Sequence, residues 1–261
     1  MILALINNKG GVAKTTSAVN LAAALAEKDK RVLLIDADSQ GAASLSLGVP
    51  RAELTPSLAE ALINQKPIRE IIRKTKVEGL DLITGANDLA GIDMALAGAD
   101  QKELRLNRSL EPVLGEYAHV IIDCPPSLSL MSVNALNAAE FYLVPVVPQF
   151  LTLGGLASLV EEVNRICGRN GEVADLMGFL LTMVDYRNRT TVALVESMRS
   201  GWKDNVLKTE IRVNVKLSEA PSLGKTIFEH APGSSGAKTY RELATEVLAR
   251  YDAMTTSDSG N

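Results

Sequence analysis

The first 28 residues, Met1 to Lys28, read MILALINNKGGVAKTTSAVNLAAALAEK and decide the fold. Met1–Asn7 is a short apolar run that ends in a turn, which is typical of a buried parallel strand. Lys14–Lys28 is rich in alanine and leucine, and its apolar residues recur at helical spacing. A strand, a glycine-rich turn and a helix in this order predict the first unit of an α/β domain.

The same alternation continues along the chain. Short apolar runs predict further strands at Arg31–Asp36, Leu80–Thr84, His119–Asp123, Glu140–Val147 and Leu176–Val184. Helical patterns lie at Ser57–Asn64, Lys102–Glu116, Leu130–Ala139, Leu151–Cys167, Thr190–Ser200 and Ser235–Tyr251. Together they predict an α/β fold, a single-domain doubly wound and mostly parallel sheet flanked by helices. The domain should span residues 1–254, and the polar segment Thr255–Asn261 should be a disordered tail.

The composition is that of a globular protein. Of the 261 residues, 46% are hydrophobic and 22% are charged, which excludes disordered and fibrous classes. Two cysteines, Cys124 and Cys167, provide no disulfide framework, and the start of the chain has no signal-peptide pattern, so the cytoplasm is the expected compartment. Apolar runs such as Phe141–Val147 are far shorter than the roughly 20 residues of a membrane-spanning helix. The net charge of −4 argues at first sight against nucleic acid as a partner.

The turn after the first expected strand has the composition of a phosphate-binding loop. It consists of Lys9, Gly10, Gly11, Val12, Ala13, Lys14, Thr15 and Thr16. In the pattern GxxxxGK[ST], glycines let backbone N–H groups wrap the phosphates, and the lysine reaches the β and γ oxygens. Lys14 suits that role, the Thr15 hydroxyl suits Mg²⁺, and Thr16 suits the α-phosphate. The alternative is a glycine-rich turn that binds no ligand.

Two residues of this loop leave questions open. Ala13 stands where glycine is usual, and its methyl group is tolerable unless the backbone there needs a positive φ. Lys9 is not required by a simple phosphate loop. It is either an ordinary solvated lysine or a residue that reaches the nucleotide of a partner subunit across a dimer interface.

Three aspartates follow two of the expected strands. Asp36 ends the run RVLLID, Asp38 follows two residues later, and Asp123 ends the run HVIID. An aspartate at the carboxyl end of a strand beside the phosphate loop can complete a Mg²⁺ shell, usually through water, so Asp123 is the expected metal residue. Asp36 is expected near the nucleotide, and Asp38 is the candidate for positioning the attacking water. Aspartates also cap turns and helices, which is the alternative for each.

These stretches together resemble a known family. KGGVAKTT, LLIDADSQGAAS and VIIDCPPS are similar to the deviant Walker A, A′ and Walker B motifs of ParA-type partition ATPases, in the ParA/Soj branch beside MinD. Leu180–Asp185 and Asn214–Ile227 are also similar to that branch. The resemblance implies an ATPase that binds ATP and Mg²⁺, forms a homodimer around the nucleotide, binds double-stranded DNA without sequence specificity, and releases it when a ParB-like partner stimulates hydrolysis.

The resemblance also implies roles for single residues. Lys9 becomes the signature lysine that acts across the dimer, Lys14 the phosphate lysine within the subunit, Asp38 the hydrolytic aspartate, Asp123 the Walker B aspartate, and Asn214 the contact to adenine. Departures from the family pattern are Ala13, Ser39 in place of proline, Ala42 in place of asparagine, and Arg212-Val213 in place of Pro-Arg.

The charges are unevenly distributed along the chain. Residues 187–250 hold 11 basic and 7 acidic side chains, which leaves 16 basic and 24 acidic ones elsewhere. The basic excess, together with the family resemblance, makes Arg187, Arg189, Arg212 and Lys216 the candidate DNA contacts. On charge alone, scattered solvated side chains are the favoured interpretation, and the family resemblance reverses it.

Other functions share these motifs. MinD-type ATPases end in a basic amphipathic helix that binds lipid, whereas residues 252–261 read DAMTTSDSGN, so no membrane partner is expected. Iron–sulfur carriers need cysteines that face each other across a dimer, and Cys124 and Cys167 are more simply core thiols. A nucleoid-bound ATPase that positions a protein cargo, such as a carboxysome or a chemoreceptor cluster, and a scaffold with negligible turnover remain open. Nucleoid association in the cytoplasm is the expected location.

Overall fold

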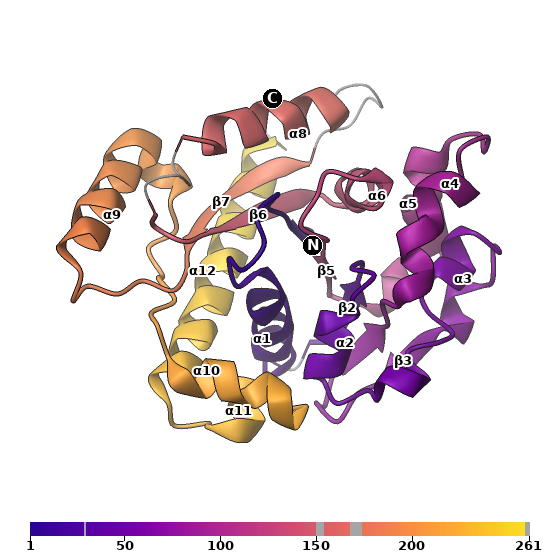
Figure 1. The fold of residues 1–261 in the computed structure, drawn as a ribbon, viewed down its shortest axis with the longest axis horizontal. Helices are drawn as coiled ribbons and strands as arrows, with labels where there is room; N and C mark the ends of the chain where they lie inside the picture. The colour runs from indigo at the N-terminus through magenta and orange to yellow at the C-terminus, as the bar shows by residue number, and fades with distance from the viewer. Residues whose placement is uncertain (29, 150–153, 168–173, 259–261) are drawn as a thin grey trace.

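A single seven-stranded sheet forms the centre of the described molecule (Figure 1). The computed structural model describes residues 1–28, 30–149, 154–167 and 174–258. The strands are β1 Ile2–Leu5, β2 Val32–Asp36, β3 Ile72–Lys74, β4 Leu80–Ile83, β5 His119–Asp123, β6 Phe141–Val146 and β7 Asp175–Leu181. Their order across the sheet is β3-β4-β2-β5-β1-β6-β7.

All strand pairs except one are parallel, as the apolar runs predict. β1 lies between β5 and β6, and β5 pairs with β2 on its other side. The register places Asp123 opposite both Leu5 and Asp36. The carboxyl ends of β1, β2 and β5 therefore meet at one edge of the sheet, where parallel α/β folds bind their ligands.

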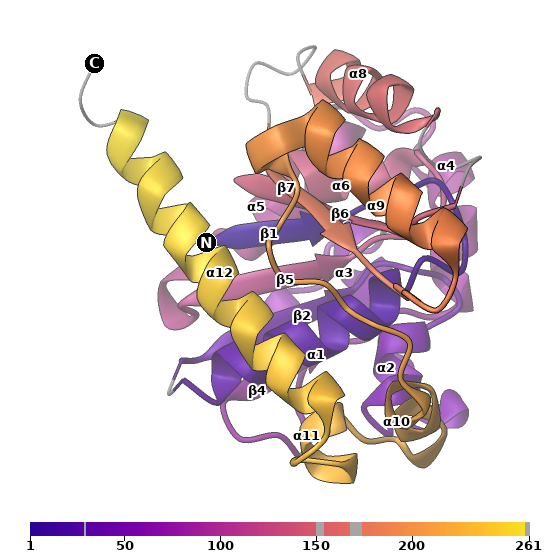
Figure 2. The same cartoon turned by 90° about the vertical axis from the view of Figure 1, so that its left-hand side faces the viewer.

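Helices cover both faces of the sheet (Figures 1 and 2). The α-helices are α1 Lys14–Ala26, α2 Ala42–Ser46, α3 Leu58–Leu62, α4 Ile92–Ala95, α5 Arg105–Leu110, α6 Leu130–Ala138, α8 Leu156–Cys167, α9 Arg189–Trp202, α10 Val215–Glu219, α11 Ile227–His230 and α12 Ser235–Asp258. Short 3-10 helices are η1 Arg51–Glu53, η2 Ile68–Glu70, η3 Asn87–Gly91, η4 Lys102–Leu104, η5 Leu114–Glu116, η6 Lys203–Asn205 and η7 Ala220–Leu223.

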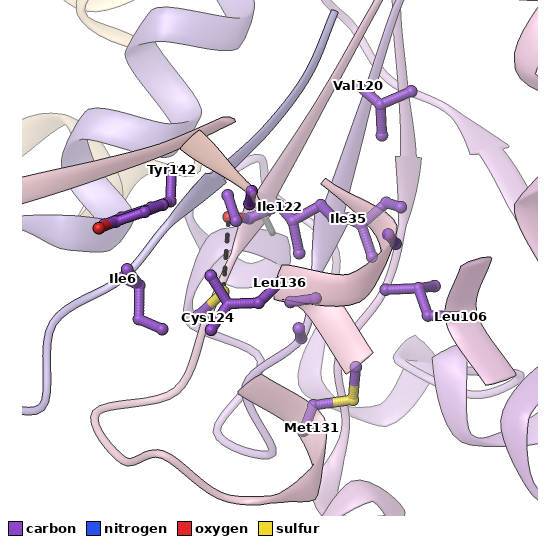
Figure 3. Packing of buried hydrophobic residues seen from close by; sticks show 14 of the residues in the cluster. Ile6, Ile35, Leu106, Val120, Ile122, Cys124, Met131, Leu136 and Tyr142 are labelled. Atoms are coloured by element: carbon purple, nitrogen blue, oxygen red, sulfur yellow. Dashed lines mark hydrogen bonds between the residues drawn. The ribbon is translucent and has the colours of Figure 1, made fainter. Parts of the chain in front are cut away.

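The sheet separates two hydrophobic cores because successive strand residues point to opposite faces. Leu3, Leu5 and Leu34 face α1 and α12, which lie side by side in Figure 2. The opposite core contains Ile6, Ile35, Val120 and Ile122, together with Met131 and Leu136 of α6 (Figure 3). Cys124 is 1% exposed in that core, as expected of a core thiol. The Cys167 side chain lies outside the described residues.

The structure differs from the sequence-based expectations in several elements, among them the short helices α2, α4, α10 and α11, which were not predicted. β3 was not predicted; it is a three-residue edge strand, antiparallel to β4. The helix expected over Lys102–Glu116 is divided into η4, α5 and η5, since Pro112 cannot continue an α-helix. Of the helix expected over Leu151–Cys167, residues 151–153 lie outside the described part, and α8 begins at Leu156.

The polar tail prediction is also wrong over part of its length. α12 continues to Asp258, so Thr255 to Asp258 are helical, while residues 259–261 lie outside the described part. Two hydroxyls support this end of the helix, because Thr255 Oγ1 donates to the Tyr251 carbonyl at 2.8 Å and Thr256 Oγ1 to the Asp252 carbonyl at 2.7 Å. Met254 also packs against the core beside α1.

Within the described part of the chain, none of the helices combines the length and the apolar character that crossing a membrane requires.

Candidate functional site

The phosphate loop lies between β1 and α1 and is fixed at both of its ends, to the neighbouring strand β6 and to the residue that follows β7. Asn7 is 2% exposed; its Nδ2 donates to the Pro145 carbonyl at 2.8 Å, and its Oδ1 accepts from the Lys9 amide at 2.9 Å. Thr182, at the end of β7, donates its hydroxyl to the Val12 carbonyl at 3.1 Å. Neither residue is predictable from a local pattern, because their partners are 138 and 170 positions away along the chain.

Ala13 caps the start of α1 in the left-handed region, with φ 58° and ψ 30°. Gly11, two residues earlier, has φ 74°. The backbone at Ala13 therefore does need a positive φ, the condition under which alanine is not a neutral replacement for glycine. An L-residue with a Cβ pays about 1–2 kcal/mol in this conformation. The loop keeps the shape that glycine would favour, at a cost in strain.

The remaining loop residues gather around the first turn of α1. Lys14 is the first residue of that helix and is 7% exposed, so its ammonium group is largely removed from solvent. Lys9, Thr15 and Thr16 are half-buried, and Gly10 and Gly11 are exposed. Exposed glycines beside a helix N-terminus leave room for an anion to approach the backbone amides.

Asp123 ends β5 next to this turn. It is fully buried, and neither of its carboxylate oxygens has a hydrogen-bond partner among the described residues. Burial is the main cause that raises the pKa of Asp123 to about 8; the charge of Asp36 adds to the rise, whereas Thr15 and Lys14 oppose it. Buried carboxylate oxygens are normally hydrogen-bonded. Two unused oxygens beside a lysine and a hydroxyl fit a hydrated Mg²⁺ ion.

Asp123 and Thr15 suit a magnesium ion better than a metal ion whose ligands are all protein side chains. In the described ranges, no three His, Cys, Asp or Glu side chains cluster as a metal cage. Mg²⁺ usually binds through one or two carboxylates and keeps waters and substrate phosphates as its other ligands. Asp123 with the Thr15 hydroxyl could supply such a partial shell.

Asp36, the neighbour of Asp123 in the sheet, is held quite differently. Its Oδ2 accepts from the Ser44 amide at 2.8 Å and from the Ser44 hydroxyl at 2.7 Å, while its Oδ1 accepts from the Asp38 amide at 3.3 Å. Burial raises the pKa of Asp36 to about 6, and the bonds from Ser44 oppose that rise. Both oxygens thus hold the loop after β2, and contact with a nucleotide stays a prediction.

Ser44 and Gly85 complete this loop, and neither was predicted from the sequence. The Ser44 hydroxyl also accepts from the Gly85 amide at 3.2 Å. A Cβ on Gly85 would lie 2.4 Å from the Asp38 carbonyl oxygen and 2.8 Å from Asp36 Oδ1, so only glycine fits there. These contacts come from three separate segments, which explains why no local pattern indicated them.

Asp38 lies at the turn that follows β2. Its Oδ1 accepts from the Gln40 amide at 2.9 Å, and its carbonyl accepts from the Gly41 amide at 3.0 Å. Oδ2 accepts no hydrogen bond from a described residue. The side chain is half-buried, and its charge contributes to the raised pKa of Asp123. The turn therefore fixes one oxygen and leaves the other available near Asp123.

A cavity of about 350 Å³ adjoins the phosphate loop. Its lining comes from the loop, from the end of β7 and from α10 and α12, namely Gly11, Ala13, Thr16, Met183, Ile211, Arg212, Val213, Asn214, Leu217, Ser218, Pro221 and Tyr240. Asn214 Oδ1 accepts from the Lys216 amide at 2.9 Å, and Nδ2 donates to the Ser235 hydroxyl at 3.0 Å. Asn214 thus lines a space beside the loop that suits a nucleoside, and it also joins α10 to α12.

The four candidate DNA contacts are all exposed, and three of them have partners within the chain. Arg187 donates to both oxygens of Asp185, at 2.8 and 2.7 Å, which lowers the pKa of Asp185 to about 2. The Arg212 guanidinium lies 5.1 Å from the centre of the Tyr186 ring, and Lys216 Nζ lies 2.8 Å from Glu219 Oε2. Arg189 begins α9. Exposed pairs of this kind contribute little stability, so their opening for a phosphate costs little.

Comparison with known proteins gives consistent matches over the chain. The family model of an AAA domain matches residues 1–174. The sporulation initiation inhibitor protein Soj of Bacillus subtilis is 42% identical over 248 residues, which are 95% of this chain and 98% of Soj. The chromosome partitioning protein ParA of Myxococcus xanthus is 39% identical over 251 residues, 95% of this chain and 88% of that protein. Among solved structures, cobyrinic acid a,c-diamide synthase from Mycobacterium smegmatis with bound ADP and magnesium has a TM-score of 0.84 at 30% identity, covering 96% of this chain and 95% of that one.

Proposed function

The chain belongs to the ParA/Soj family of P-loop ATPases, and from that premise we propose that it binds ATP with Mg²⁺ and hydrolyses it to ADP and phosphate. The observation that carries this proposal is the buried Asp123 carboxylate, which lies near Lys14 and Thr15. Its two oxygens have no hydrogen-bond partner among the described residues. A neighbouring ATP-binding loop explains why these carboxylate oxygens lack hydrogen-bond partners among those residues, since the hydrated Mg²⁺ that accompanies ATP would supply them. The neighbour that was solved with ADP and magnesium supports the same assignment.

Each residue of the loop has a role in the proposed reaction. The backbone amides after Gly10 and the Lys14 ammonium bind the phosphates, and Asn214 contacts the base. Lys9 of a second subunit adds positive charge where charge accumulates on the transferred phosphoryl group. Thr15 and, through a water, Asp123 would hold Mg²⁺, which would supply neutralisation of the phosphate charge. Catalysis of this kind depends on positioning and charge stabilisation rather than on covalent chemistry.

Asp38 is the proposed hydrolytic residue. Its Oδ1 is fixed by the Gln40 amide, and Oδ2 accepts no bond from a described residue, so Oδ2 is able to hold the attacking water. The rigid loop held by Asp36 and Ser44 keeps this oxygen in place. A slow intrinsic rate is expected from the resemblance to partition ATPases.

We further propose that the ATP-bound chain forms a homodimer, binds double-stranded DNA through Arg187, Arg189, Arg212 and Lys216, and responds to a ParB-like partner. Dimerisation doubles the basic surface, which raises an electrostatic affinity without any reading of base sequence. This assigns the chain to chromosome or plasmid segregation, on the nucleoid in the cytoplasm. The identities of 42% and 39% to Soj and ParA support segregation over the positioning of a protein cargo.

DNA binding measured with ATP, with ADP and without nucleotide tests the proposal. The wild type should bind only with ATP, Lys14→Ala should not bind, and Asp38→Ala should stay bound because it does not hydrolyse. Arg187→Glu should keep its ATPase rate and lose DNA binding, while Arg51→Glu, at an exposed arginine of η1, is the matched control. Binding that is independent of nucleotide, or unaffected by Arg187→Glu at low salt, contradicts the proposal.

A further inference from the structure

A second cavity of about 270 Å³ lies between the ends of α3 and α5, two helices that neighbour each other in Figure 1. It shares no lining residue with the cavity beside the phosphate loop. Three basic side chains line it, Lys66, Arg105 and Arg108, and its described lining contains no aspartate or glutamate. The cavity is thus strongly basic in the half of the chain that is acidic overall.

The two arginines of this cavity, half-buried Arg105 and exposed Arg108, have no acceptor among the described residues. Arg105 Nε is buried without a hydrogen-bond acceptor among the described residues, and the Arg108 guanidinium has no ion pair within the same ranges. By contrast, Arg199 lies 2.6 Å from a carboxylate oxygen of Glu210. A buried charged donor without an acceptor is costly in the folded protein, which points to an acceptor supplied from outside the chain.

Geometry and lining indicate the kind of acceptor. Arg105 and Arg108 stand three positions apart on α5, so they lie on neighbouring parts of one helix face. Guanidinium groups match the oxygens of carboxylates and phosphates in a bidentate manner. Pro67, Ile68 and Pro112 add apolar walls. We propose that this cavity is an oxyanion-binding site that takes one carboxylate or phosphate group through Arg105 and Arg108, with Lys66 at its rim.

Lys66 has the weaker role in this site. Its Nζ lies 3.6 Å from Glu70 Oε2 in an exposed pair, so part of its charge is already compensated. Removal of Lys66 should therefore weaken anion binding less than removal of either arginine.

The site is tested by titrating the ¹⁵N-labelled full chain with inorganic phosphate and, separately, with glutarate, at constant ionic strength in chloride. Backbone amide shifts are read for residues 65, 66, 68 and 105–111, which surround the cavity and carry an N–H. Phosphate also reaches the phosphate loop, so the shifts of the two sites are followed separately. A saturable shift in these residues is expected with at least one probe, and its size relative to the other probe identifies phosphate or carboxylate as the preferred group.

Variants decide whether the arginines are responsible. Arg105→Gln and Arg108→Gln should each weaken the saturable binding at least tenfold, and Arg51→Gln should leave it unchanged. Thermal unfolding without probe checks folding, and Arg105→Gln should not lower the Tm, because it removes a half-buried guanidinium whose buried Nε has no acceptor among the described residues. Absence of saturation with both probes, or equal weakening in Arg51→Gln, overturns the proposal. ATPase activity is measured in parallel and should be the same in all three variants.

Discussion

Two buried aspartates lie at opposite ends of the parallel strands, and they differ in their hydrogen bonds and in the direction of their pKa shifts. Asp81 lies at the amino end of β4 and is 4% exposed, and its Oδ2 accepts from Tyr117 at 2.8 Å, Lys74 at 2.9 Å and Arg31 at 3.2 Å. Burial alone raises the pKa of Asp81, but these bonds outweigh it and lower the pKa below its usual value. Asp123, at the carboxyl end of β5, accepts no hydrogen bond from any residue that the structure describes, and burial raises its pKa.

The difference separates structural from functional carboxylates. The protein completes the coordination of Asp81 with its own side chains, so that this charge stabilises the fold. It leaves Asp123 incomplete at the edge where the phosphate loop and the Asp38 turn converge. A carboxyl group whose charged form is disfavoured by burial is retained where a cation can stabilise that charge.

Replacing Asp123 tests the functional half of this contrast and should have the largest effect. Asp123→Asn keeps the shape and removes the negative charge, so the ATPase rate should fall by about 100-fold or more, since charge neutralisation and positioning supply most of the catalysis. The Tm of the nucleotide-free protein should stay equal or rise, because no hydrogen bond to a described residue is lost and the amide cannot acquire a buried charge. Steady-state ATPase assays and calorimetry measure both. A clear drop in the Tm would show that Asp123 is partnered within the fold.

Replacing Asp81 is the matched change at the other edge. Asp81→Asn leaves three donors without their charged acceptor and should lower the free energy of unfolding by about 2–3 kcal/mol. The ATPase rate of the folded protein should be unchanged, because β4 brings Asp81 to the amino edge, away from the phosphate loop. Denaturant unfolding gives the stability. Loss of ATPase activity in Asp81→Asn that is still fully folded would contradict the assignment of a purely structural role to Asp81.

The pH dependence of stability gives an independent check on Asp81. Its pKa is lower in the folded chain than in the unfolded chain, so its contribution is fully present above the unfolded value of about 4 and is lost as the pH falls through the lowered folded value. The stability difference between wild type and Asp81→Asn should therefore shrink below about pH 4. Unfolding curves at pH 7, 5 and 3 measure it. A difference that stays constant over this range would mean that the charge of Asp81 is not what stabilises the fold.

The parallel strands and the charged residues of the candidate site were predictable from the sequence. The residues that hold the loops of that site in place were not. Clean apolar runs made the six parallel strands predictable, whereas β3, with the sequence Ile72-Arg73-Lys74, is too short and too basic to show a strand pattern. Lys14 and Asp123 were predictable because they belong to local motifs at strand ends. Ser44 and Thr182 were not, since a serine or threonine has no pattern of its own and its partner is set by the tertiary fold. The pairing of Arg187 with Asp185 was missed for a different reason, because charge counting does not say which charges are already paired.

The smallest expected effect concerns the backbone at the functional edge. Ala13 has a φ of 58°, and Gln101, far along the chain before η4, has a φ of 50°. Ala13→Gly and Gln101→Gly should each stabilise the fold by about 0.5–1 kcal/mol, because relief of left-handed strain exceeds the greater entropy of glycine in the unfolded chain. Only Ala13→Gly should also change ATP affinity or turnover, by a few-fold, since only Ala13 belongs to the loop that wraps the phosphates. Thermal unfolding and ATP titration of the two variants separate the effects. If Ala13→Gly gains no stability while Gln101→Gly does, contacts within the loop already compensate the backbone strain at Ala13. The functional site then differs from the rest of the fold in the missing partners of Asp123 among the described residues and not in backbone strain.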